Sequence, residues 1–175
     1  MNYATIKWTD IANGEGVRIS LFVSGCTHKC KNCFNQVAWD FSYGEPFDKR
    51  VAEKILTELG SSFIAGLSLL GGEPLEPQNQ EALYPFIQEV KRKYPQKTIW
   101  CYTGFELDEK SGKLKEKRKN TAVTQRLISL FDVLVDGPYI EKLKDIRLKF
   151  RGSSNQRVID VQKTLETKHC VLYLE

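Results

Sequence analysis

Three of the five cysteines in the chain lie within one eight-residue stretch, residues 26–33, with the spacing C-x3-C-x2-C. Cysteine thiolates at such short spacing are typical ligands of iron–sulfur clusters and of zinc. A cubane 4Fe-4S cluster held by Cys26, Cys30 and Cys33 alone would keep one iron without a protein ligand. That iron could bind a substrate or a cofactor, so the spacing predicts a cluster that takes part in chemistry.

Two other interpretations of these cysteines are weaker. Together with His28 they could form a Cys3His zinc site, but structural zinc ligands usually come as two pairs from separate segments. A disulfide is disfavoured because the number of cysteines is odd and because no charged and apolar signal segment begins the chain.

A second motif, Gly71-Gly72-Glu73-Pro74, directly follows the apolar run at 63–70. Two glycines allow a sharp turn and a close approach of the backbone to a ligand. The Glu73 carboxylate could receive a ligand ammonium group. Taken alone, the motif is equally compatible with an ordinary turn.

Apolar runs typical of strands alternate with amphipathic stretches typical of helices, which indicates βα units with a parallel sheet. We expect strands at 17–24, 63–70, 98–102, 132–135, 157–161 and 171–174, and helices at 48–59, 79–92 and 121–130. Asp48 is the expected cap of the first helix, which should end near Gly60. In such sheets ligands bind at the carboxyl ends of the strands, and both motifs fall there.

Length and composition limit the fold. A chain of 175 residues, 41% hydrophobic and 27% charged, is typical of one globular domain. A βαβ unit takes about thirty residues, so five or six units fit, fewer than a closed eight-fold barrel needs. The periodicity leaves a partial barrel and a doubly wound sheet open. No apolar run approaches the ~20 residues of a membrane span, and we expect a cytoplasmic protein without a membrane partner.

The net charge of +4 is concentrated in two segments. Residues 110–119 carry net +5 and residues 142–151 carry net +4, so the remainder is acidic. This distribution argues against a broad phosphate-binding face, and we expect no nucleic-acid partner. Either segment could contact an acidic partner, but residues 110–119 are Lys-rich and poor in apolar side chains, and we interpret them at least equally well as a solvated loop.

The two motifs together, about forty residues apart, resemble those of the radical S-adenosylmethionine (SAM) enzymes. Further segments narrow the resemblance to the family of anaerobic ribonucleoside-triphosphate reductase-activating proteins, over about residues 5–162. These are NGEGVR at 13–18, SGC at 24–26, CFN at 33–35 with Trp39, YTG at 102–104, DGPY at 136–139 and RGSSNQR at 151–157. Many radical SAM enzymes place an aromatic residue before the third cysteine to meet the adenine, whereas this chain has Asn32 there and Phe34 after it.

The resemblance implies an open partial (βα) barrel of five to six units, with residues 1–175 forming a single radical SAM domain. It implies that Cys26, Cys30 and Cys33 are the catalytic cluster ligands. It also implies a SAM site, whose candidate residues are Asn32 or Phe34 for the adenine, together with Cys33, Gly71, Gly72, Glu73 and Asp136. We expect His28 to be a neighbour of the cluster and not a ligand.

The activity implied by the resemblance begins with one electron from a donor protein such as a flavodoxin or ferredoxin. The reduced cluster cleaves SAM to methionine and a 5′-deoxyadenosyl radical, which takes a hydrogen atom from a backbone glycine of anaerobic ribonucleoside-triphosphate reductase. Residues 142–151 are the best candidates to border the opening for that partner.

Two other functions remain open at this stage. One is a radical SAM enzyme acting on a small molecule such as a modified-base precursor, and the other is a zinc-bearing adaptor without catalysis. The small size of the chain favours an activating protein, because little chain remains to enclose a small substrate.

Overall fold

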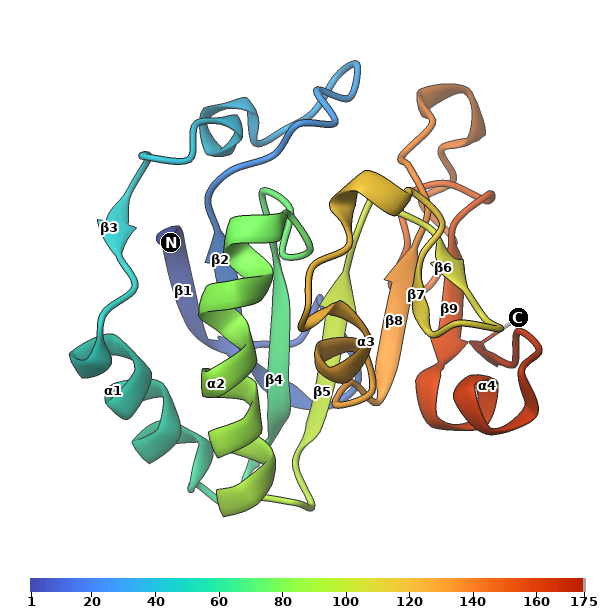
Figure 1. Cartoon of the computed structure of the whole chain (residues 1–175). Coiled ribbons are helices and arrows are strands. Elements are labelled where there is room, and N and C mark those ends of the chain that lie inside the picture. The colour runs from blue at the N-terminus through green and yellow to red at the C-terminus, as the bar shows by residue number, and fades with distance from the viewer. Residues whose placement is uncertain (175) are drawn as a thin grey trace.

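The structure is a computed structural model that describes residues 1–174, and an open eight-stranded sheet runs through it (Figure 1). The larger elements in chain order are β1 (Asn2–Asp10), β2 (Val17–Val23), β3 (Glu45–Pro46), α1 (Lys49–Leu59), β4 (Ile64–Gly71), α2 (Pro77–Lys93), β5 (Thr98–Tyr102), β6 (Leu107–Asp108), β7 (Lys113–Leu114), α3 (Thr124–Ile128), β8 (Val133–Asp136), β9 (Arg157–Asp160), α4 (Val161–Thr167) and β10 (Leu172–Leu174). Short 3-10 helices lie at η1 (Gln36–Trp39), η2 (Lys117–Lys119) and η3 (Glu141–Leu143). Across the sheet the strand order is β10-β9-β8-β5-β4-β2-β1-β3, and β6 pairs with β7 separately.

The centre of the sheet is parallel and its two flanks are antiparallel. Strands β2, β4, β5 and β8 run parallel, and the chain between them passes through α1, α2 and α3 in turn. On one flank β1 pairs antiparallel with β2, and on the other β9 pairs antiparallel with β8. The four parallel strands therefore end at one common edge, at the top of Figure 1.

The expected open partial (βα) barrel of five to six units is wrong. The described residues form a mixed sheet with four α-helices, and the flanking pairs do not continue the parallel order. A parallel strand needs a crossover of a dozen or more residues, usually a helix, whereas antiparallel strands need none. The connection of β1 to β2 spans six residues, 11–16, and residues 137–156 join β8 to β9 without an α-helix.

The helices cover one face of the sheet and form the main core. Figure 1 shows α2 and α3 in front of the strands, and α1 at the lower left of the sheet. Ile19, Leu21 and Val23 of β2 are buried in the same cluster as residues of these helices, and Arg18, Ser20 and Phe22 alternate with them along the strand. On the opposite face, the rings of Phe150 and Tyr173 pack edge-on against Trp100, at 5.1 and 5.4 Å between centroids.

Most of the expected elements are confirmed, with shifted ends. The strand at 98–102 is confirmed in full, and Asp48 caps α1 by accepting a hydrogen bond from Val51 N at 2.9 Å. The expected helix at 121–130 is shorter, at Thr124–Ile128, and β1, β3, the β6–β7 pair and α4 were not expected. Within residues 1–174, no helix is long and apolar enough to cross a membrane.

Candidate functional site

A cavity of ≈ 670 Å³ lies at the edge of the sheet where the parallel strands end. This size is typical of sites for small molecules and cofactors. Its wall contains Cys26, Cys30 and Cys33 from the loop after β2, residues 71–73 from the turn after β4, and residues 102–104 from the end of β5. The structure thus brings both sequence motifs to one cavity, at the strand ends where ligands were expected.

The cysteine loop, residues 25–39, is fastened at both ends by the backbone. Gly25 N donates to Ala38 O at 2.8 Å, and Cys26 N donates to Trp39 O at 3.2 Å. Between these anchors Cys33 N donates to Cys30 O at 3.2 Å, and Lys29 and Asn32 adopt positive φ angles of 50° and 60°. The loop therefore closes on its own base, after β2, within fifteen residues, and all three thiols lie between the two ends of the loop.

The three thiols are half-buried, and none of them is in a disulfide. No three His, Cys, Asp or Glu side chains among residues 1–174 lie close enough together to hold a single metal ion. A cubane cluster does not require the three sulfur atoms to lie that close together, because each thiolate binds a different iron. Burial raises the pKa of the Cys26 thiol to about 11, which favours the neutral thiol, and coordination to a metal would remove its proton. The three cysteines on one cavity wall fit a 4Fe-4S cluster.

The turn after β4 packs directly onto the base of the cysteine loop. Gly71 has a φ of +109°, and a Cβ at Gly72 would lie 2.7 Å from Gly25 O and 2.9 Å from Ala38 O. The turn is held there because Glu73 N donates to Gly25 O at 2.8 Å. Glycine is required at position 72 by the backbone of the cysteine loop, and at position 71 by its positive φ and by the backbone of Phe22 and Val23 in β2.

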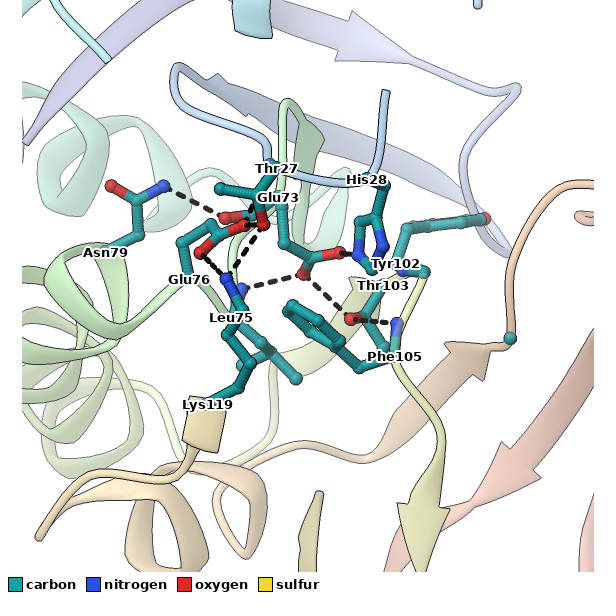
Figure 2. Close-up of polar contacts among 12 residues, drawn as sticks. Thr27, His28, Glu73, Leu75, Glu76, Asn79, Tyr102, Thr103, Phe105 and Lys119 are labelled. Carbon is teal, nitrogen blue, oxygen red and sulfur yellow. Dashed lines mark hydrogen bonds and ion pairs between the residues drawn. The ribbon is translucent and has the colours of Figure 1, made fainter. Parts of the chain in front are cut away.

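Glu73 is the centre of a polar network that Figure 2 shows. Its side chain is 1% exposed, and its Oε1 accepts hydrogen bonds from Leu75 N at 2.8 Å and Thr103 Oγ1 at 2.7 Å. Its Oε2 accepts one from Gly104 N at 2.8 Å and lies 2.8 Å from His28 Nε2. A carboxylate has about four acceptor sites, and here four partners occupy them. Glu73 borders the cavity, but it joins the cysteine loop to the ends of β4 and β5.

His28 supports the loop from within this network. Its ring packs against Phe105 at 4.3 Å between centroids while Nε2 meets Glu73. Burial by itself would lower the pKa of His28, but the hydrogen bond and charge of Glu73 outweigh it and raise that pKa. The imidazole is placed beside the cluster loop and holds it to the strand ends.

A second buried carboxylate, Glu76, fastens the same loop, and sequence reasoning missed it. Its Oε1 accepts from Thr27 N at 2.9 Å and also from Thr27 Oγ1, while Oε2 pairs with Lys119 Nζ at 2.8 Å. Lys119 Nζ also donates to Thr27 Oγ1 at 2.8 Å (Figure 2). Lys119 belongs to the segment interpreted as a solvated loop, and for this residue and the buried Leu114 that interpretation is wrong. The contact spans 92 residues, and no local pattern in the sequence indicates it.

The two candidates for the adenine lie at the mouth of the cavity. Asn32 and Phe34 both contribute to its lining, and the Phe34 ring is 95% exposed. Ile146, on the loop after β8, is 90% exposed and borders the same cavity. The mouth therefore carries two large apolar side chains that nothing within residues 1–174 covers.

Asp136 lies away from the cavity wall, although it ends β8 at the correct edge of the sheet. Its carboxylate is 0% exposed and accepts from Arg157 Nε at 2.8 Å, Arg157 Nη2 at 2.5 Å and Leu107 N at 2.8 Å. The hydrogen bonds that Arg157 donates to Asp136, together with the negative charge of that carboxylate, raise the pKa of Arg157. The geometry favours a structural ion pair over a cofactor contact at this position.

Comparison with known proteins agrees with this site. Residues 12–159 match a family model described as a 4Fe-4S single cluster domain. The chain is 46% identical over 158 residues to the anaerobic ribonucleoside-triphosphate reductase-activating protein of Haemophilus influenzae, covering 89% of this chain and 96% of that protein. The protein of that name from Escherichia coli K12 is 41% identical over 90% of this chain and 97% of its own length, and that of Enterobacteria phage T4 is 37% identical over 90% and 93%. This chain belongs to the family of anaerobic ribonucleoside-triphosphate reductase-activating proteins.

Proposed function

We propose that this chain activates an anaerobic ribonucleoside-triphosphate reductase by reductively cleaving SAM and generating a glycyl radical on the reductase. The observation that carries the proposal is the shared cavity, in which Cys26, Cys30 and Cys33 from one loop meet the glycine turn at residues 71–72. The partner is proposed from the relatives, because each of them is named as an activating protein for that reductase.

Cys26, Cys30 and Cys33 are the proposed ligands of the 4Fe-4S cluster, with one iron free to take SAM. When bound, the cluster and SAM supply one-electron cleavage of the sulfonium and abstraction of a hydrogen atom from the reductase glycine. The protein holds the ligands in place through the backbone bonds of Gly25 and Cys26 to Ala38 and Trp39. This positioning is what the chain itself contributes, since the reactive groups belong to the cofactors.

The SAM site proposed here is lined by Cys33, by the turn at Gly71 and Gly72, and by Asn32 or Phe34 at the mouth. Glu73 acts by ordering the turn and His28, because its acceptor sites are already filled within the protein. Asp136 is left out of the set because its carboxylate binds Arg157.

The apolar part of the cavity wall has its own role. Phe22, Leu70 and Phe150 line the cavity, and apolar side chains exclude water and exchangeable hydrogen donors from a reactive centre. The exposed Phe34 and Ile146 at the mouth suit contact with a macromolecule better than enclosure of a small substrate.

We also propose a domain organisation, an electron donor and a cellular location for this chain. The chain works as a single radical SAM domain, residues 1–175, of which Glu175 lies outside the described residues. A one-electron donor protein such as a flavodoxin or ferredoxin supplies the electron, in the cytoplasm, without a membrane or nucleic-acid partner.

The test is anaerobic reconstitution with iron and sulfide, followed by mixing with SAM, a chemical reductant and the reductase. We expect about four irons per chain, formation of 5′-deoxyadenosine, and a glycyl radical on the reductase in the electron paramagnetic resonance spectrum. A Cys30→Ala protein should give neither product. Formation of 5′-deoxyadenosine with no radical on the reductase would instead favour a small-molecule substrate, and a zinc-loaded protein without iron would contradict the cluster.

A further inference from the structure

The segment that joins β6 to α3 exposes a concentrated positive charge. Its exposed basic side chains are Lys110, Lys113, Lys115, Lys117 and Arg118. Residues 110–119 carry net +5, which exceeds the net +4 of the whole chain. A local field of this kind attracts a partner of opposite charge.

Part of this charge is neutralised within the protein, and part is not. Lys115 pairs with Glu106 at 2.7 Å, and the nearby Glu109 pairs with Arg157 at 2.5 Å. Among residues 1–174, no carboxylate lies within ion-pair distance of the side chains of Lys113, Lys117 or Arg118. Two of them, Lys117 and Arg118, directly precede Lys119 in the chain, and we call these two residues the donor surface.

The donor surface is fixed beside the cysteine loop. Lys119 closes η2 and donates from Nζ to Thr27 Oγ1 and to the buried Glu76, as Figure 2 shows. Thr27 is the residue after Cys26, one of the proposed cluster ligands. Lys117 is two residues from Lys119 and so at most ~7 Å away along the chain. The exposed charges are therefore held close to the cysteine loop by an ion pair between the buried Glu76 and the partly exposed Lys119.

This surface also lies apart from the cavity. Of the described residues, none between 105 and 136 contributes to the cavity wall, and neither Thr27 nor Glu76 does so. A protein bound at the donor surface would approach the cysteine loop from outside the cavity. The mouth with Phe34 and Ile146 would remain free for SAM and for the reductase.

We propose that the donor surface docks the one-electron donor protein, through an acidic face that surrounds the redox centre of that protein. The inference rests on the proposed function, which requires such a donor. In the transfer itself the donor loses one electron and the cluster gains it, and no bond is made or broken. Opposite charges on the two faces raise the rate of productive encounter, and this gain weakens as salt is added.

The experiment compares two electron sources on the same reconstituted protein, with SAM present and the reductase omitted. One source is a flavodoxin of net negative charge, reduced to the hydroquinone, and the other is sodium dithionite. The variant is Lys117→Glu with Arg118→Glu, and the readout is the rate of 5′-deoxyadenosine formation. With limiting flavodoxin at low salt, we expect the rate of the variant to be about tenfold lower than that of the unaltered protein. At roughly 0.5 M salt the difference between the two rates should fall to about twofold. With dithionite the two rates should agree.

The chain offers a matched control in Lys49→Glu with Arg50→Glu. This pair has the same two residue types and the same change of charge, and its side chains are 90% and 91% exposed at the start of α1. The control should keep the flavodoxin-driven rate within about twofold. An equal loss in the control would mean that net charge and not this surface steers the donor, which would overturn the proposal.

Two further outcomes would also overturn it. A loss with dithionite as well as with flavodoxin would show that residues 117–118 support the cysteine loop. A normal flavodoxin-driven rate, combined with a lower glycyl-radical yield when the reductase is added with dithionite, would assign the surface to the reductase. Failure of the unaltered protein to cleave SAM with dithionite would instead refute the proposed function, and the inference with it.

Discussion

Replacing Asp136 by Asn should destabilise the protein while leaving SAM binding intact. The side chain keeps its size, but the buried carboxylate loses its charge. The NH2 group of the new amide would also face an N–H group of Arg157 or Leu107, and two donors cannot form a hydrogen bond. Hydrogen bonds to charged groups contribute about 1.5–3 kcal/mol each, and breaking one side of a buried ion pair costs about 3–5 kcal/mol.

The expected cost lies at the lower end of that range. The Arg157 side chain is 26% exposed, so its guanidinium can regain water when the carboxylate is lost. We expect a free energy of unfolding lower by about 3 kcal/mol, which corresponds to a Tm lower by about 6–12 °C in a domain of this size. The measurement is anaerobic urea unfolding of reconstituted protein with matched iron content, with the m-value unchanged.

A second variant separates burial from charge. Glu109 pairs with the same guanidinium, through Arg157 Nη1 at 2.5 Å, but its carboxylate is reached by solvent. Glu109→Gln should cost less than about 1 kcal/mol, as partly exposed pairs usually do. The reasoning is refuted if Asp136→Asn leaves the urea midpoint unchanged and lowers SAM affinity tenfold or more, since Asp136 would then serve the cofactor.

Three further predictions concern the cavity. Cys26→Ala should abolish 5′-deoxyadenosine formation whereas Cys170→Ala, on an exposed thiol, should retain it with normal iron content, and activity in the first variant would contradict the cluster assignment. Gly72→Val should reduce iron loading as well as SAM binding, because its Cβ would lie 2.7 Å from Gly25 O. If iron loading and SAM binding were both normal in this variant, the motif would be an ordinary turn. Lys144→Glu, at the mouth, should slow reductase activation without changing dithionite-driven SAM cleavage, and equal losses in both assays would place Lys144 in the cofactor site.

Local patterns in the sequence were sufficient for the central elements. The apolar runs of β2, β4 and β5 and the Asp48 cap of α1 follow from side chains a few residues apart, and each is confirmed. The placement of both motifs at the ends of parallel strands follows from the same elements. The family resemblance is also confirmed, because it depends on residue identities and not on pairing.

Strand direction on the flanks could not be predicted in this way. Only residues 4–9 of β1 alternate between partly buried and exposed side chains, and β1 becomes recognisable as a strand through its antiparallel register with β2. The strand expected at 157–161 was confirmed as β9, but its antiparallel pairing with β8 depends on residues 21 to 27 positions apart. Alternation of strands and helices cannot specify which neighbour a flanking strand chooses.

The polar contacts of the site were the least predictable part. Glu73 was expected to face a ligand, yet four donors from His28, Leu75, Thr103 and Gly104 use its oxygen atoms. Lys119 reaches the cysteine loop across 92 residues. Such contacts depend on the folded arrangement of three or more segments, and the residue types alone are equally compatible with solvent exposure.

The Glu73 network also sets the order in which the protein can mature. During synthesis the three cysteines leave the ribosome about seventy residues before Thr103 and Gly104. These two residues donate hydrogen bonds to Glu73, and Glu73 in turn contacts His28 of the cysteine loop. Domains fold as units once their sequence is available. The cysteine loop therefore reaches its final position only after β5 has joined the sheet. Iron that arrives earlier would encounter the three thiols on a loop that is not yet held in place. With the proposed ligands, cluster assembly is a late step that depends on Glu73, Thr103 and Gly104 as well as on the cysteines.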